Sequence, residues 1–185
     1  MTPVEIVAVI FSLLCVFFTL KNNIWCWPTG LVGVIAYAFV FYDVKLYSDV
    51  ILQIIYIFMQ FAGWYAWLHG GKDKTKLPIT DLTIKENVGW ILATIAATGL
   101  WGTIMHYQTD AACPYPDAFI VMASLAAQWL LCVKKVQAWI AWITVDAIAI
   151  WVYAYKELYL TSGLYALFFF MAIMGYREWR KLKVA

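Results

Sequence analysis

Apolar stretches long enough to cross a membrane recur along the chain, and this feature constrains the fold more than any other. A helix needs about 20 apolar residues to cross the hydrocarbon core, and in lipid the backbone must satisfy its own hydrogen bonds. The pattern therefore predicts an all-α membrane protein. Its seven transmembrane helices are expected at residues 3–20, 24–42, 49–68, 88–106, 116–133, 138–155 and 160–177.

The scarcity of charged side chains excludes a water-soluble globular fold. Charged residues make up 13% of the chain and hydrophobic residues 65%, whereas a soluble domain carries about 25% charged residues. So few charges cannot cover a water-facing surface, and the surrounding solvent must therefore be largely lipid. The net charge of +2 is too small to indicate a nucleic-acid partner.

The distribution of Lys and Arg predicts the orientation of the chain. If the N-terminus lies outside, only Lys45 and Lys156 of the 13 basic residues fall in outer segments, and the others fall in cytoplasmic segments. Positively charged segments stay preferentially on the cytoplasmic side. We therefore expect the N-terminus outside and the C-terminus in the cytoplasm.

The chain repeats itself at an offset of 112 residues. At this offset Asn22-Asn23 falls on Lys134-Lys135, and identical residues coincide at Trp27 and Trp139, Leu46-Tyr47 and Leu158-Tyr159, Gly63 and Gly175, and Trp67 and Trp179. Several matches at one offset indicate a duplication, and such repeats build known transporter folds. We predict a 3+1+3 plan of parallel repeats. In this plan residues 1–68 form the first three-helix repeat, 69–110 a cytoplasmic loop and linker helix, and 111–185 the second three-helix repeat.

Three stretches, spread over both repeats, carry a family resemblance. They are Trp27-Pro28-x-Gly30 with Phe41-Tyr42-x-x-x-Leu46-Tyr47; Gly63-Trp64-Tyr65-x-Trp67; and Trp139-x-x-Trp142-x-x-x-Asp146 with Tyr159 and Gly175-x-x-x-Trp179. Together they resemble the PnuC family of bacterial vitamin transporters. The resemblance implies a SWEET-like seven-helix fold in the bacterial inner membrane. It also implies facilitated diffusion of an unphosphorylated, water-soluble B vitamin, which a cytoplasmic kinase traps after entry.

The resemblance favours nicotinamide riboside as the vitamin, because this is the substrate of the best-known family members. Asp146 departs from the family pattern, since nicotinamide riboside carriers usually have Asn at this position. A thiamine carrier of the same family (the PnuT branch) is therefore the alternative, and a riboflavin or nucleoside carrier comes after it.

Asp146 is expected near the middle of the sixth helix, where an ionisable side chain costs about 2.5–3.5 kcal/mol to insert. The spacing of Trp139, Trp142 and Tyr153 places them on the same helix face. Aromatic rings beside a carboxylate suit a planar cation, through stacking, cation–π attraction and counter-charge. We predict that these four side chains bind the substrate. The structural alternative is that Asp146 is protonated or pairs with a neighbouring helix, and that Trp139 is only an interfacial anchor.

Other polar side chains within the spans are candidates to complete the substrate site. The amides of Gln53, Gln60 and Gln128 each offer two donors and an acceptor to a ribose or an amide, and Tyr56 offers a hydroxyl. Gln53 and Gln60 are seven residues apart and can share a helix face. The alternative for each of them is a hydrogen bond between helices.

The second helix is a candidate gating element. It carries Pro28, Gly30 and Gly33, which at the 112-residue offset fall on the bulkier Ile140, Trp142 and Val145. We expect this helix to bend during gating, because proline and small residues are common causes of helix bending.

Other classes of function fit the sequence less well. A membrane-embedded enzyme needs a second deep carboxylate, a nucleophile–base pair or metal ligands, and none stands out. The four cysteines show no paired spacing, and His69 and His106 are expected on opposite sides of the membrane. We therefore expect no enzymatic activity, no cofactor and no metal. The expected partners are a small cationic vitamin and the lipid bilayer; homo-oligomerisation and proton coupling stay open.

Overall fold

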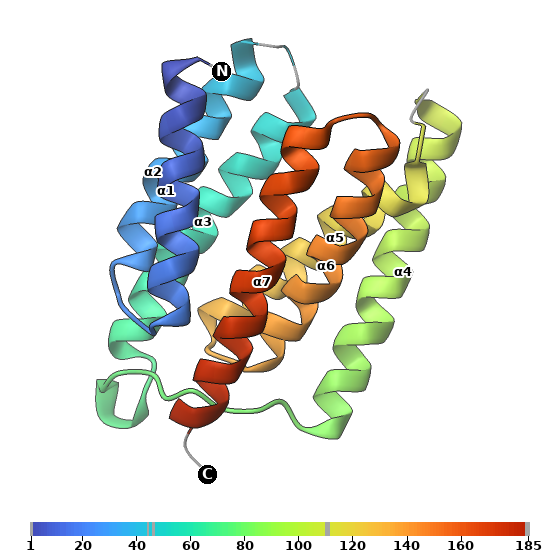
Figure 1. Cartoon of the computed structure of the whole chain (residues 1–185). Coiled ribbons are helices and arrows are strands. Elements are labelled where there is room, and N and C mark those ends of the chain that lie inside the picture. Colours follow the sequence, from blue (N-terminus) through green and yellow to red (C-terminus); the bar gives the residue numbers. More distant parts are fainter. Residues whose placement is uncertain (1, 44, 46, 110–111, 184–185) are drawn as a thin grey trace. The chain divides into compact units, whose positions relative to one another are not determined.

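The structure is a computed structural model that describes residues 2–43, 45, 47–109 and 112–183, with the backbone alone at residues 47–49. Figure 1 shows the helices α1 (Pro3–Leu20), α2 (Cys26–Asp43), α3 (Tyr47–His69), α4 (Ile84–Gln108), α5 (Pro114–Cys132), α6 (Gln137–Tyr155) and α7 (Tyr159–Leu182), and the short 3₁₀ turn η1 (Lys72–Lys74). All seven α-helices have the length and apolar composition to cross a membrane. The predicted all-α fold with seven spans is confirmed.

Two helices, α4 and α7, extend at one end by four or more residues beyond their predicted spans, because polar residues continue them. The α4 helix begins at Ile84, four residues early, because Thr83 and Glu86 cap it reciprocally. The Thr83 hydroxyl accepts a hydrogen bond from the Glu86 N–H at 3.3 Å, and the Glu86 carboxylate accepts one from the Thr83 N–H at 2.7 Å. The α7 helix continues to Leu182, and basic side chains in its last turn favour that end of the helix dipole.

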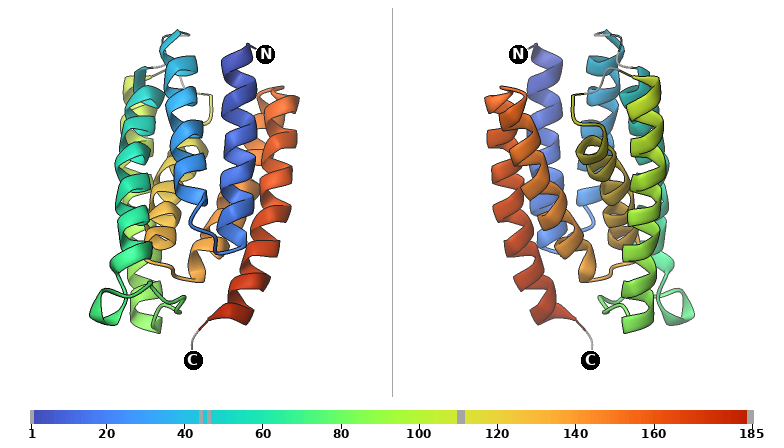
Figure 2. Two further views of the ribbon diagram at one scale, coloured as in Figure 1. Left: turned by 90° about the vertical axis from the view of Figure 1, so that its left-hand side faces the viewer. Right: turned by 90° about the vertical axis from the view of Figure 1, so that its right-hand side faces the viewer.

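The chain forms two compact units. Unit 1 contains residues 1–78 and 132–134, and unit 2 contains residues 79–131 and 135–185. Within unit 1, α1 packs against α2 and α2 packs against α3; within unit 2, α6 packs against α7 (Figures 1 and 2). The predicted division at residues 68 and 110 stays a prediction.

The backbone repeats at the same 112-residue offset as the sequence. We call α1–α3 the first repeat and α5–α7 the second. Asn22, after α1, and Lys134, after α5, both have φ of 51°. In both turns the next residue donates its N–H to the carbonyl five positions earlier, at 2.9 Å. The turns that follow α2 and α6 match as well, with φ of 61° at Lys45 and 62° at Glu157.

The first repeat is held together by an aromatic contact over a glycine. Trp27 of α2 packs edge to face against Trp67 of α3, with ring centroids 5.2 Å apart. A Cβ atom added at Gly63 of α3 would lie only 1.9 Å from Cη2 of Trp27. Any side chain at position 63 would therefore push the indole ring out of its place between the two helices.

The second repeat has the same contact at the equivalent positions. Trp139 of α6 packs edge to face against Trp179 of α7, with ring centroids 5.5 Å apart. A Cβ atom added at Gly175 would lie 2.6 Å from three atoms of the Trp139 ring. Both tryptophans are buried, so the internal duplication extends from the sequence to side-chain packing.

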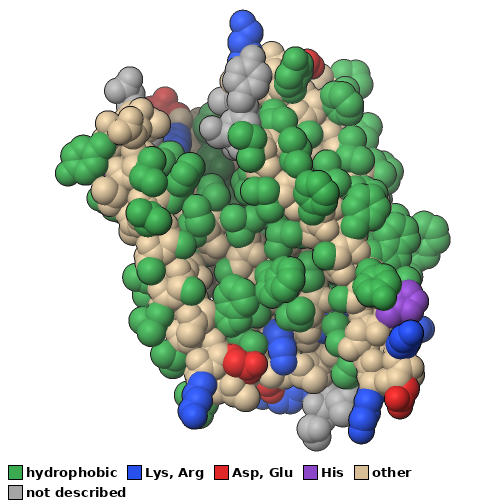
Figure 3. Space-filling model, turned by 180° about the vertical axis from the view of Figure 1, so that it is seen from behind, with side chains coloured by type: hydrophobic (Ala, Val, Ile, Leu, Met, Phe, Trp, Pro, Cys, Tyr) green, Lys and Arg blue, Asp and Glu red, His purple; other side chains and the backbone are tan. Residues whose placement is uncertain are grey.

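The sides of the helices are apolar. On the face shown in Figure 3, hydrophobic side chains cover the helices, and the charged side chains lie at helix ends. Large apolar side chains are exposed on several helices, including Phe39, Phe58 and Phe170. Within α4, only Gly102 is buried. A lipid environment accounts for these exposed apolar faces, because no water-soluble surface is built this way.

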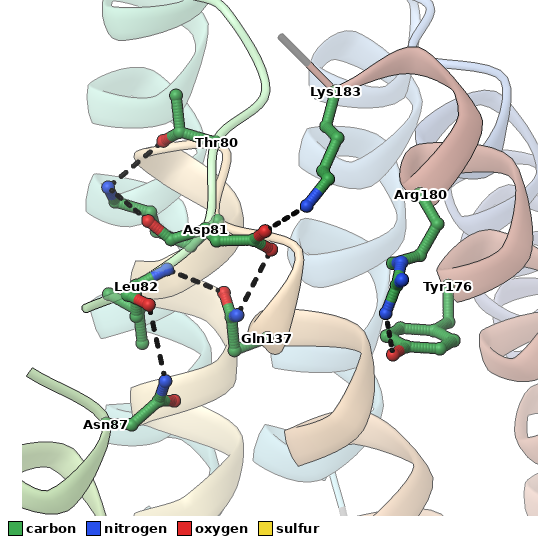
Figure 4. A network of polar contacts seen from close by, with 9 residues as sticks. Thr80, Asp81, Leu82, Asn87, Gln137, Tyr176, Arg180 and Lys183 are labelled. Atoms are coloured by element: carbon green, nitrogen blue, oxygen red, sulfur yellow. Dashed lines mark hydrogen bonds and ion pairs between the residues drawn. The ribbon is translucent and has the colours of Figure 1, made fainter. Parts of the chain in front are cut away.

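Within unit 2, a polar network holds the residues that precede α4 (Figure 4). The Lys135 ammonium donates to the Thr80 hydroxyl at 3.0 Å, and the Gln137 amide donates to the Asp81 carboxylate at 3.2 Å. Lys183, just beyond α7, forms an ion pair with Asp81. The hydrogen bond from Lys183 lowers the pKa of the Asp81 carboxyl below its ordinary value.

Candidate substrate-binding residues

Asp146 lies in the middle of α6, and its side chain is buried, with 2% of the residue exposed. Among the residues that the structure describes, no side chain forms a hydrogen bond or an ion pair with its carboxylate. A buried charge without a partner is unfavourable, so the carboxylate needs a proton or a ligand. The structural alternative of a pair with a neighbouring helix finds no support in the described residues.

Trp142 precedes Asp146 by one helical turn and is half-buried. Its indole Nε1–H is fully buried and has no acceptor in the described part of the chain. A buried N–H without an acceptor is uncommon in folded proteins and calls for a partner such as a ligand or a water molecule. The two groups therefore provide an unpaired donor and an unpaired carboxylate on adjacent turns of α6.

Trp139 and Tyr153, the other two predicted residues of this face, already have aromatic partners. Trp139 packs against Trp179, as described above, although its Nε1–H is buried without an acceptor among the described residues. Tyr153 stacks on Tyr165 of α7, with ring centroids 5.1 Å apart and the rings inclined by 25°. These contacts place α6 against α7, and any contact of the two side chains with a substrate stays a prediction.

The predicted residues of α3 are buried as well. Gln60 is 6% exposed, and its Oε1 atom has no hydrogen-bond partner in the described residues. Gln53, two turns earlier, is also buried, and Tyr56 between them is half-buried. A buried amide with an unpaired oxygen is unfavourable until something donates to that oxygen. Gln60 is therefore the strongest candidate of the three.

The remaining predicted residues lie on α5 and α2. Gln128 of α5 is half-buried. Pro28 is the third residue of α2, where a missing N–H costs no hydrogen bond, so it does not break the helix. Gly30 and Gly33 are buried, and a Cβ atom at Gly33 would lie 3.0 Å from the Ser12 hydroxyl of α1. The glycines thus allow close approach between helices, and bending of α2 stays a prediction.

Two contacts of charged side chains are absent from the sequence predictions. Lys156, after α6, binds both carboxylate oxygens of Asp117 in the first turn of α5, each at 2.8 Å. The Lys134 ammonium lies 4.2 Å from the centroid of the Trp67 ring within unit 1. Burial lowers the pKa of Lys134 to about 8, Cys26 opposes this shift, and Lys76 adds to it.

Comparison with known families decides what class of protein this is. The family model described as nicotinamide mononucleotide transporter matches residues 2–181. The chain belongs to this family. Membership covers both repeats and α4, and it confirms the predicted family resemblance.

Relatives and a solved structure agree with the family. The nicotinamide riboside transporter PnuC of Escherichia coli (strain K12) is 24% identical, over 95% of this chain and 84% of that protein. PnuC of Neisseria mucosa is 28% identical, over 95% and 71%. The riboflavin/roseoflavin transporter RibM of Streptomyces davaonensis is 25% identical, over 95% and 83%. A crystal structure of the vitamin B3 transporter PnuC superposes with a TM-score of 0.75, at 28% identity, covering 95% of this chain and 80% of that chain.

These similarities establish the class of function. The chain is a multi-pass membrane transporter for a small molecule, and the expectation that it is not an enzyme is confirmed. The names of the relatives give different vitamins, so family membership alone does not identify the vitamin that this chain carries.

Proposed function

We propose that this protein carries nicotinamide riboside into the cell by facilitated diffusion. The observation that carries a cationic vitamin is Asp146, a buried carboxylate without a partner in the described residues, one turn from the unpaired indole N–H of Trp142. Nicotinamide riboside has a cationic pyridinium ring, which a carboxylate neutralises and an indole face attracts. The names of several relatives and of the solved structure support the same substrate class.

Two other vitamins are supported by specific observations. Thiamine has a cationic thiazolium ring, and the Asp146 carboxylate would suit it equally well. Riboflavin is the named substrate of the relative RibM. Its ring system is uncharged, so it gives no reason for a buried carboxylate. The carboxylate therefore ranks the two cations above riboflavin, and a nucleoside comes last.

We further propose that the protein lies in the bacterial inner membrane with its N-terminus outside, as the Lys and Arg distribution predicts. In this orientation the network around Asp81 and the basic end of α7 face the cytoplasm. Facilitated diffusion only brings the substrate to its electrochemical equilibrium, and we propose that a cytoplasmic kinase phosphorylates the vitamin after entry and thereby traps it.

Calorimetric titration of the purified protein in detergent tests the substrate. Nicotinamide riboside, thiamine, riboflavin and a deoxynucleoside are titrated into the wild type and into Asp146→Asn, which removes the charge and keeps the shape. We expect micromolar binding of nicotinamide riboside that Asp146→Asn changes by about ten-fold or more, or transfers to another vitamin. Binding that this variant leaves unchanged would remove Asp146 from the site.

Asp73→Asn is the matched control, because Asp73 is exposed in η1 and has a left-handed φ of 56° that Asn tolerates. It should bind like the wild type. Transport into liposomes then decides the mechanism: accumulation that follows an imposed pH gradient would indicate proton coupling, and equilibration without accumulation supports facilitated diffusion.

A further inference from the structure

Gly30 of α2 lies directly against the side chain of Gln60 of α3. A Cβ atom added at Gly30 would lie 2.6 Å from Nε2 and 2.8 Å from Oε1 of Gln60. The third close atom is Sγ of Cys15 on α1, at 2.9 Å. These separations are shorter than van der Waals contact, so even a methyl group at position 30 would displace the Gln60 amide.

The Gln60 amide is buried with an unpaired oxygen. In the described part of the chain its Oε1 atom has no hydrogen-bond partner, although the residue is 94% buried. An amide that is paired with protein groups would have a fixed orientation. Here both polar atoms of the amide occupy the space that a Cβ atom at position 30 would need, so the amide can lie where it does only because position 30 is a glycine.

The second repeat has the opposite arrangement at the equivalent positions. At the 112-residue offset, Gly30 corresponds to Trp142 on α6, and Gln60 corresponds to Ala172 on α7. The first repeat thus has a small residue on its second helix and a large one on its third, and the second repeat reverses the two. In each repeat the large residue has a buried polar atom without a partner among the described residues: the acceptor Oε1 of Gln60 and the donor Nε1–H of Trp142.

We propose that Gly30 is a specificity-determining position of the transporter. Its missing side chain leaves room for the Gln60 amide, so that the amide can hydrogen-bond the hydroxyl or amide groups of the substrate. This inference rests on the proposed function, because it assigns Gln60 to the same vitamin. It differs from the sequence-based prediction, in which Gly30 only allows α2 to bend.

A mutant cycle between positions 30 and 60 tests this role. Gly30→Ala, Gln60→Ala and the double variant are titrated with nicotinamide riboside and assayed for transport in liposomes. We expect each single variant to raise the Kd by about ten-fold. The double variant should bind no more weakly than Gln60→Ala, because the added methyl group then has no amide to displace. The rate at saturating substrate should change little.

Gly33→Ala is the control for crowding on the same helix, since its Cβ atom would meet Ser12 and not Gln60. If Gly30→Ala and Gly33→Ala both slow transport and leave the Kd unchanged, α2 acts as a bending element and the inference is wrong. Independent effects of Gly30→Ala and Gln60→Ala on the Kd would overturn it as well.

Melting temperatures without substrate separate this inference from the proposed substrate. We expect Gly30→Ala to melt below the wild type and Gln60→Ala to restore the loss in the double variant. If Gly30→Ala does not fold but the double variant does, the contact with Gln60 is supported. If neither folds, Cys15 limits the space and the inference fails. If the melting temperatures follow this pattern but the protein does not bind nicotinamide riboside, only the proposed substrate is refuted.

Discussion

The contact between Gly175 and Trp139 leads to a quantitative prediction about the second repeat. In Gly175→Ala the new Cβ atom would lie 2.6 Å from Cη2, Cζ2 and Cζ3 of Trp139, whereas carbon atoms in contact lie about 3.5–4.0 Å apart. The ring would have to move by about 1 Å. Trp139 and Trp179 are almost fully buried against each other, so the ring has no free direction.

Overpacking of this kind costs about 1–3 kcal/mol, while the better helix propensity of alanine returns about 1 kcal/mol. Gly163→Ala on the same helix isolates the second effect, because no atom lies within 4 Å of a Cβ atom there. The difference in unfolding free energy between Gly175→Ala and Gly163→Ala should therefore be about 1–3 kcal/mol.

Unfolding in detergent micelles, followed by the near-ultraviolet circular dichroism of tryptophan, measures this difference. Trp139→Phe in the Gly175→Ala background should restore part of the stability, because Phe lacks the ring that carries the clashing atoms. The same change in the first repeat, Gly63→Ala, should cost more, since its Cβ atom would lie 1.9 Å from Trp27. Equal stability of Gly175→Ala and Gly163→Ala would refute the reasoning.

Two predictions concern charged groups outside the spans. Asp117→Asn should destabilise the protein by about 1–3 kcal/mol, because the Lys156 ammonium, which is 27% exposed, loses its carboxylate partner. A double-mutant cycle with Lys156→Met measures the coupling, and additive effects would contradict it. Burial lowers the pKa of Lys134 from 10.5 to about 8, so between these two values the unfolded chain binds a proton that the folded chain does not. Unfolding experiments at increasing pH should therefore show the wild type gaining stability relative to Lys134→Gln from about pH 8 to 10.5; a difference between the two proteins that does not change over this range would exclude the contribution of Lys134.

The sequence alone was sufficient for the number, class and approximate position of the helices. The reason is that lipid leaves the backbone no alternative to internal hydrogen bonds, so each long apolar run becomes a helix. The early start of α4 was also encoded locally, since Thr83 and Glu86 have the spacing of a capping box. Asp146 was recognisable from the sequence as well, because an ionisable residue inside an apolar run is costly to insert into a membrane and therefore indicates a functional site.

Only the tertiary structure decided which side chains are already satisfied. Trp139 and Trp142 look equivalent in the sequence, and in the described residues the N–H of each lacks an acceptor. The ring of Trp139, however, is fully packed over a glycine of α7, whereas Trp142 is only half-buried. Helical periodicity predicts which residues share a face of one helix, but it carries no information about the helix that packs against that face.

The contacts between residues far apart in the sequence follow the same rule. Gly30 and Gln60 lie on different helices, and Lys156, after α6, pairs with Asp117 of α5. Their pairing depends on how close two helices approach and on the rotation of each about its axis, which are set by the packing of all the side chains between them. The sequence therefore determined the spans and the internal duplication, whereas the structure determined which buried polar atoms lack a partner among the described residues.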